Sequence, residues 1–133
     1  MGGLVKFQTP QGAAVWVAPG QVCEVFHDER VQPGAAAVLA CTDGNQQGVS
    51  ASLDDVDKAI PGLLAGKASV GRVLIAPANV TRVKPYRASA FTDPVPGAQC
   101  IVEFANNRSR VLFDPVEEMA GRISEALAKA DQT

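Results

Sequence analysis

The stretch Val15-Trp16-Val17-Ala18-Pro19-Gly20-Gln21-Val22 decides the fold, because its pattern recurs 58 positions later in the chain. The second copy reads Val73-Leu74-Ile75-Ala76-Pro77-Ala78-Asn79-Val80, so the apolar residues, the Ala-Pro step and the closing valine all have counterparts. Further along, the second copy gains five residues and the offset becomes 63. We therefore expect an internally duplicated chain with two repeats, over about 4–66 and 70–130.

Length and composition indicate one compact domain over residues 1–133. Hydrophobic residues make up 47% of the 133 residues, which excludes a disordered chain. No apolar run approaches the roughly 18 residues of a membrane span, and the first residues lack the long apolar region of a secretion signal. The three cysteines are odd in number and widely spaced, so we expect reduced thiols. These features predict a cytoplasmic protein without a membrane partner.

Each repeat is predicted to form a β-meander followed by a C-terminal helix, which makes an α+β fold with pseudo-two-fold symmetry. Proline cannot donate to a strand ladder, so Pro19 and Pro77 predict bends between strands. The pair Asp43-Gly44 suits a hairpin turn. The expected strands cover residues 4–7, 15–17, 22–26, 36–41 and 48–51, and then 72–76, 80–83, 100–104 and 110–113.

The helix of each repeat has a recognisable start. Ser52 precedes the first helix and Asp114 precedes the second, and both residue types can accept the free backbone N–H groups of a first turn. Pro61 and Gly62 predict that the first helix ends early and continues as a loop through Gly66. We expect both helices on one side of the sheets. The predicted buried stripe of the second helix is Val116, Met119, Ile123 and Leu127.

Catalytic and metal-binding patterns are weak in this sequence. The single histidine, His27, shares an extended segment with Cys23 but would lie about 13 Å from it. One histidine and no close cysteine pair leave the usual zinc ligand sets unfilled. We therefore expect no catalytic residue, metal or cofactor, and an enzyme centred on His27 is the second alternative.

Charge separates the two halves of the chain. Residues 1–66 carry three basic and seven acidic residues (3 − 7 = −4), whereas residues 67–133 carry nine and seven (9 − 7 = +2). The basic residues of the second half include Arg82, Lys84 and Arg87, with Tyr86 between the last two. In the alignment of the repeats, Asp28 and Glu29 stand where Tyr86 and Arg87 stand. Equivalent surfaces therefore have opposite sign.

Two functions follow from this pattern. Surfaces of opposite charge can meet head to tail between subunits, which predicts a non-catalytic interaction or assembly protein that forms a homo-oligomer. An exposed Trp16 would mark a partner surface. The alternative is that the basic segment 67–87 binds single-stranded nucleic acid or DNA, with Tyr86 and Phe91 stacking on bases.

The order of segments also resembles known families. An apolar segment ending in valine, a turn, a two-strand hairpin and a helix with an acidic start are similar to small flagellar FlbD-like proteins and to LytTR-type DNA-binding domains. The resemblance lies in hydrophobic spacing. LytTR-like binding implies a basic face in the first repeat, which is acidic here, so no functional residue is transferred. The segments that carry the resemblance are Val15 to Val25, Val38 to Val56, Val73 to Val83 and Ile101 to Met119.

Overall fold

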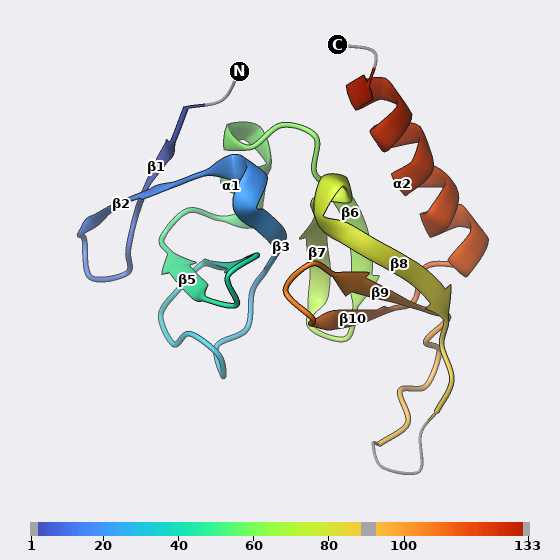
Figure 1. Ribbon diagram of the computed structural model, residues 1–133. Coiled ribbons are helices and arrows are strands. Elements are labelled where there is room, and N and C mark those ends of the chain that lie inside the picture. Colours follow the sequence, from blue (N-terminus) through green and yellow to red (C-terminus); the bar gives the residue numbers. More distant parts are fainter. Residues whose placement is uncertain (1–2, 89–92, 132–133) are drawn as a thin grey trace.

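The computed structural model describes residues 3–88 and 93–131, and this part of the chain forms ten strands in three antiparallel sheets with two helices (Figure 1). The α+β prediction is confirmed. The strands are β1 (Val5–Gln8), β2 (Ala14–Val17), β3 (Val22–Phe26), β4 (Ala37–Cys41), β5 (Gln46–Val49), β6 (Leu64–Ala68), β7 (Gly71–Ile75), β8 (Val80–Pro85), β9 (Cys100–Phe104) and β10 (Ser109–Leu112). The helices are α1 (Leu53–Ala59) and α2 (Val116–Asp131), and two 3₁₀ turns are η1 (Pro19–Gln21) and η2 (Pro77–Asn79).

The three sheets are separate, and backbone hydrogen bonds just beyond strand ends link them in a row. Their separate orders are β1-β2, β5-β4-β3-β7-β6 and β10-β9-β8. Just beyond β5, Ser50 N donates to Gln8 O of β1 at 2.8 Å, and just beyond β10, Phe113 N donates to Lys67 O of β6 at 2.8 Å. The order therefore runs β2-β1-β5-β4-β3-β7-β6-β10-β9-β8. Strands β2 and β8 are its two ends.

The meanders β3-β4-β5 and β8-β9-β10 pair their strands in the same register. Val22 pairs with Cys41 in the first meander, and Val80 pairs with Phe104 in the second. Val80 lies 58 positions after Val22, and Phe104 lies 63 positions after Cys41. A bulge follows at Val22/Glu24 and again at Val80/Arg82. A bulge at the same position bends each leading strand in the same way.

The hairpin turns of the two meanders also agree. Gly44 has a φ of 86° and Asn107, 63 positions later, has a φ of 65°. The side chains of Asp43 and Asn106 each accept a hydrogen bond from the backbone N–H two residues on, at 2.9 and 3.0 Å. Asn tolerates this left-handed conformation better than most non-glycine residues. The expected turn at Asp43-Gly44 is confirmed.

Two apolar cores lie on the opposite faces of the five-stranded sheet. Val56 of α1 belongs to one core, and Met119 and Ile123 of α2 belong to the other. The prediction that both helices cover one side of the sheets is therefore wrong: successive strand residues point to opposite faces, and β3 and β4 are buried on both faces. Leu127 was also expected in the core, but it is 38% exposed.

The proline steps form 3₁₀ turns, as the expected bends required. Pro19 and Pro77 each occupy the first positions of η1 and η2, where a missing N–H is harmless. The first turn carries the chain from β2 in one sheet to β3 in another. At each proline turn, the chain therefore leaves one sheet and enters another, from β2 to β3 and from β7 to β8.

Strand β6 was expected to be a loop through Gly66, and that prediction is wrong. Leu64–Ala68 pairs with β7 along its whole length. A Cβ at Gly66 would lie 3.3 Å from both Leu112 methyl carbons, so the small residue lets β6 approach the core of the second meander. Tertiary packing therefore decides this strand against its weak β propensity. No helix within residues 3–88 and 93–131 is long and apolar enough to cross a membrane.

Candidate functional site

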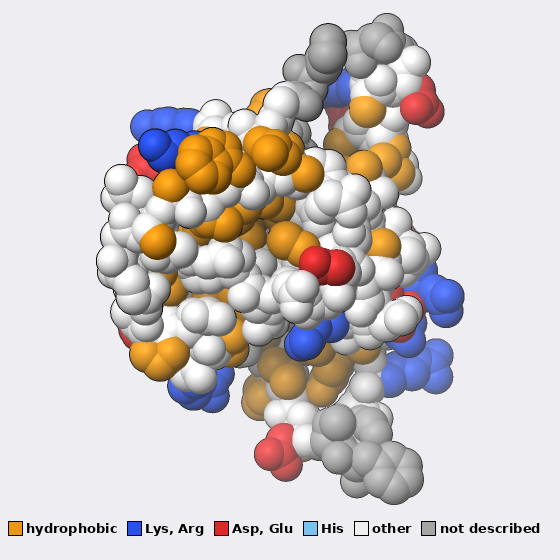
Figure 2. All heavy atoms as spheres, turned by 60° about the vertical axis from the view of Figure 1, so that its left-hand side comes forward, with side chains coloured by type: hydrophobic (Ala, Val, Ile, Leu, Met, Phe, Trp, Pro, Cys, Tyr) orange, Lys and Arg blue, Asp and Glu red, His pale blue; other side chains and the backbone are white. Residues whose placement is uncertain are grey.

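The terminal strand β2 carries the most conspicuous exposed aromatic side chain. Trp16 is 56% exposed, and the Lys6 Nζ lies 5.6 Å from its ring centroid, a cation–π contact. Leu74, which occupies the matching position of β7, is 1% exposed. Figure 2 turns the side of the β1-β2 hairpin forward and shows hydrophobic side chains gathered on this face. The sequence left the exposure of Trp16 open, and the structure places this side chain on the surface.

The terminal strand β8 is the most open strand of the second meander. It pairs with β9 on one edge, and no described strand pairs with the other edge. Val80 and Val83 are only half-buried, whereas their counterparts Val22 and Val25 are fully buried. The difference arises because β3 pairs with β4 on one edge and with β7 on the other, while β8 pairs only with β9 among the described strands.

The basic side chains of β8 are already paired within the chain. The Arg82 Nε and the Lys84 Nζ each lie 3.0 Å from a carboxylate oxygen of Glu103 on β9. The hydrogen bond from Lys84, with the nearby positive charges, lowers the pKa of Glu103. This three-residue cluster is exposed at both cations, so its contribution to stability is small. With Glu103 included, the net charge of this cluster is +1, whereas Arg82 and Lys84 alone would give +2.

Beyond β8, Tyr86 and Arg87 lie in the connection to β9. The Tyr86 hydroxyl accepts a hydrogen bond from Val95 N at 2.9 Å, and the side chain is half-buried. Arg87 is exposed. Phe91, the second proposed stacking residue, lies outside the described residues. Tyr86 therefore links the start of this connection to Val95, and its half-buried ring has less surface available for stacking on a base.

The acidic residues after β3 are likewise paired locally. Asp28 accepts from the Arg30 side chain at 3.2 Å, and this interaction lowers the pKa of Asp28. Glu29 accepts from Gly34 N at 2.8 Å, and that hydrogen bond, with a smaller effect of His27, lowers the pKa of Glu29. These carboxylates stabilise the connection from β3 to β4, so little unpaired negative charge is left for a partner.

His27 and the cysteines do not form a nucleophile–base pair. His27 Nε2 lies 3.5 Å from Glu29 Oε1 on an exposed surface. Cys23 and Cys100 are buried, and burial raises the pKa of Cys100 to about 11. Burial also raises the pKa of Cys23 and of Cys41. A thiol held in its neutral form is a poor nucleophile.

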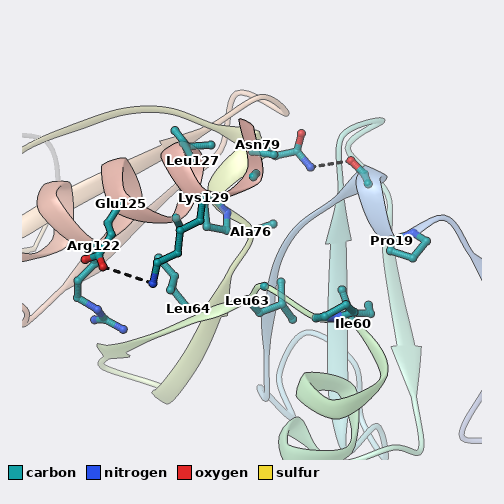
Figure 3. A pocket seen from close by; sticks show the side chains of 17 residues that line it. Pro19, Ile60, Leu63, Leu64, Ala76, Asn79, Arg122, Glu125, Leu127 and Lys129 are labelled. Atoms are coloured by element: carbon teal, nitrogen blue, oxygen red, sulfur yellow. Dashed lines mark hydrogen bonds and ion pairs between the residues drawn. The ribbon is translucent and has the colours of Figure 1, made fainter. Parts of the chain in front are cut away.

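An open apolar pocket of about 960 Å³ lies between η1, η2, the segment after α1 and the C-terminal half of α2 (Figure 3). Leu127 projects from α2 on one side, and Ile60 and Leu63 lie across from it. Its polar groups are engaged: Lys129 pairs with Glu125 at 3.4 Å, and the Asn79 amide donates to Gly20 O at 2.9 Å. The pocket offers apolar surface and few polar groups for chemistry.

The residues proposed from sequence therefore lie in three separate places. Trp16 is on β2, Asp28 and Glu29 follow β3, and Arg82 and Lys84 lie on β8, at the other end of the strand order. The sequence reasoning missed the buried Glu24, which is 5% exposed. A lone acid inside the otherwise apolar strand Val22–Phe26 was the signal for it.

Comparison of the chain with protein-family models, with curated proteins and with solved structures gave no match. Among residues 3–88 and 93–131, no group of three or more His, Cys, Asp or Glu side chains is placed to hold a metal ion.

Proposed function

We propose that this chain is a non-catalytic cytoplasmic protein that associates with further copies of itself, and that it is built from a duplicated unit. The observation that carries the proposal is that β2 and β8, the first and last strands of the row, each have one edge without a strand partner among the described residues, and that β2 bears the exposed Trp16. An unpaired edge presents free N–H and C=O groups to another strand. The three free thiols agree with a reducing compartment.

Duplication is supported by hydrogen bonds that match position by position. Ala36 N donates to Val49 O, and Gln99 N, 63 positions later, donates to Leu112 O, both at 2.9 Å. The common register, the common bulge and the two positive-φ turns agree with this match. The β3–β7 pairing, however, has no β8–β2 counterpart among the described residues. We therefore propose that the two units follow each other head to tail and are not related by a pseudo-two-fold axis.

Edge pairing explains association better than opposite charge does. The acids Asp28 and Glu29 and the bases Arg82 and Lys84 are each satisfied within the chain. Exposed interactions of this kind are screened by solvent and contribute little. Strand addition at a free edge gains backbone hydrogen bonds and buries apolar side chains on one face. We therefore assign the contact to β2 and β8, and not to the charged segments.

Light scattering after size exclusion, at low and at high salt with absorbance at 260 and 280 nm, tests the proposal. We expect an oligomer free of nucleic acid whose mass changes little with salt. The variant Lys84→Glu/Arg87→Glu should keep that mass, whereas a contact driven by opposite charges would lose it. A monomer at every concentration would overturn self-association. A monomer that carries nucleic acid only at low salt would favour the basic segment 67–87 instead.

A further inference from the structure

The contact between the two halves of the chain is an edge-to-edge strand junction. Strands β3 and β7 pair antiparallel, with Glu24 opposite Ile75 and Val25 opposite Leu74. Ala76 N donates to Cys23 O at 2.9 Å at one end of this junction. In the strand order, β3 ends the first unit and β7 begins the second. The counterparts of these strands, displaced by 58 positions, are β8 and β2.

We infer that β2 of one copy pairs antiparallel with β8 of the next copy, in the register of the internal junction. This inference rests on the proposed self-association and specifies its geometry. The displacement of 58 positions places Val17 of one copy opposite Arg82 of the next, and Trp16 opposite Val83. Each molecule then offers one strand as donor and another as acceptor, so the contact is heterologous.

The core of the second meander is open where the incoming side chain would lie. In the first meander, Leu74 covers Val25, and the exposed fractions are 1% and 0%. Val83 is half-buried at the matching place, and Trp16 is exposed at the other end of the molecule. Cross-strand partners share one face of a sheet. Bringing Trp16 onto Val83 therefore covers both exposed apolar surfaces at once.

Helix α2 contacts β8 and η2. Its buried residues Met119 and Ile123 pack in the same core as Val102 of the central strand β9. The helix therefore covers the inner face of the second meander, in the way that Val56 of α1 covers the first. Trp16 of the next copy would arrive beside this helix, where Leu74 lies near α1 in the internal junction.

The 3₁₀ turns beside the junction carry a second matching feature. In the internal junction, the Asn79 amide of η2 donates to Gly20 O of η1 and to Val22 O at the start of β3, at 2.9 and 2.7 Å. The residue of η1 that corresponds to Asn79 is Gln21, which also has an amide and is exposed. Between copies it would face the carbonyls of Ala78 and of Val80. The same type of donor is thus present for the same two acceptors.

The junction between copies would be more polar than the internal one. Glu24 and Phe26 of β3 contact Arg110 through an ion pair and a cation–π contact at 4.6 Å. Their counterparts on β8 are Arg82 and Lys84, and the counterpart of Arg110 is Gln47 on β5. A guanidinium beside a neutral amide replaces the buried ion pair, so we expect reversible association.

Disulfide trapping between two variants, each with one introduced cysteine and the buried Cys23 and Cys100 retained, tests the register. Val17→Cys in one preparation is mixed with Arg82→Cys in another, both with Cys41→Ser, and the mixture is oxidised. Directly opposed strand residues place their Cα atoms about 4.5–5.5 Å apart, within disulfide range. We expect a covalent dimer with one chain of each kind. Lys84→Cys is the matched control, because it lies on the same face of β8, also loses an ion pair to Glu103, and is two residues out of register.

The single tryptophan gives a second readout that needs no new cysteine. We expect the Trp16 emission of the unmodified chain to shift to shorter wavelength as the protein is concentrated, because the ring leaves water on pairing. Equal trapping of Arg82→Cys and Lys84→Cys, or a concentration-independent spectrum in a proven oligomer, would overturn the β2–β8 register and leave self-association standing. A monomer by light scattering at all concentrations would overturn both.

Discussion

Arg110 on β10 donates to the carboxylate of Glu24 on β3, across 86 positions of sequence. The Nε–Oε2 distance is 3.3 Å, and the Arg110 guanidinium also lies 4.6 Å from the Phe26 ring centroid. The exposed fractions of the two charged side chains are 20% and 7%. This contact joins the face of the first meander that is opposite α1 to the last strand of the second meander.

The ion pair predicts an asymmetric mutational response. Arg110→Met leaves the Glu24 carboxylate buried without its partner, and we expect the free energy of unfolding to fall by about 3–5 kcal/mol. Glu24→Leu/Arg110→Met replaces both charges by apolar groups and should restore most of that loss. Urea denaturation followed by circular dichroism measures both. A double variant no more stable than Arg110→Met would contradict this account of the pair.

Trp16 and Leu74 occupy matching strand positions but should respond differently to truncation. Leu74→Ala removes a buried side chain, and we expect a loss of about 2–5 kcal/mol in unfolding free energy. Trp16→Ala removes an exposed one and should cost under about 1 kcal/mol at concentrations where the chain is monomeric. The same Trp16 change should weaken self-association about 30-fold, as truncation of a central aromatic does at an interface. Sedimentation at several concentrations separates the two effects.

Asn107 provides a test of the turn geometry. Its φ of 65° disfavours residues with an ordinary Cβ, so Asn107→Ala should destabilise the chain by about 1 kcal/mol. Asn107→Gly should lie within about 0.5 kcal/mol of the parent chain. Gly44→Asn, made at the matching turn, should be tolerated better than Gly44→Ala. Thermal melts of these four variants would show whether the two turns obey the same rule.

Cys100 predicts a loss of stability at high pH. Its folded pKa is raised to about 11, above the ordinary 9.0, because burial disfavours the thiolate. The neutral thiol therefore stabilises the fold fully below pH 9, and this stabilisation is lost as the pH rises from 9 through 11. Cys100→Ala should show a shallower decline over that interval. Equal slopes of unfolding free energy for the two chains would show that Cys100 does not contribute.

Local sequence signals predicted most strands and both turn types. Pro19 and Pro77 marked the 3₁₀ turns, Asp43-Gly44 marked a hairpin turn, and Ser52 caps α1 by accepting from Asp55 N at 3.2 Å. These turns and this helix cap depend on residues a few positions apart, so the local sequence is enough to predict them. The expected strand of residues 100–104 coincides with β9.

Long-range packing explains what the sequence did not disclose. Gly66 can lie in a strand against Leu112 of β10 because it has no side chain, whereas a Cβ there would crowd the Leu112 methyl groups. The helices lie on opposite faces because β3 and β4 are buried on both sides, and no local pattern says which face each helix takes. The exposure of Trp16 could not be predicted, since its alternation with Val15 and Val17 did not say which of the two faces is buried. The free edge of β8 is a property of the strand order alone.

The Asn79 amide has a mechanical consequence for the whole molecule. It donates to Gly20 O of η1 and to Val22 O at the start of β3, and these hydrogen bonds are directional, unlike apolar packing. The amide therefore fixes how the two proline turns meet, in addition to the β3–β7 pairing, the Glu24–Arg110 contact and the core that residues of both halves share. Without that amide, we expect the two turns to move against each other while the two halves stay joined.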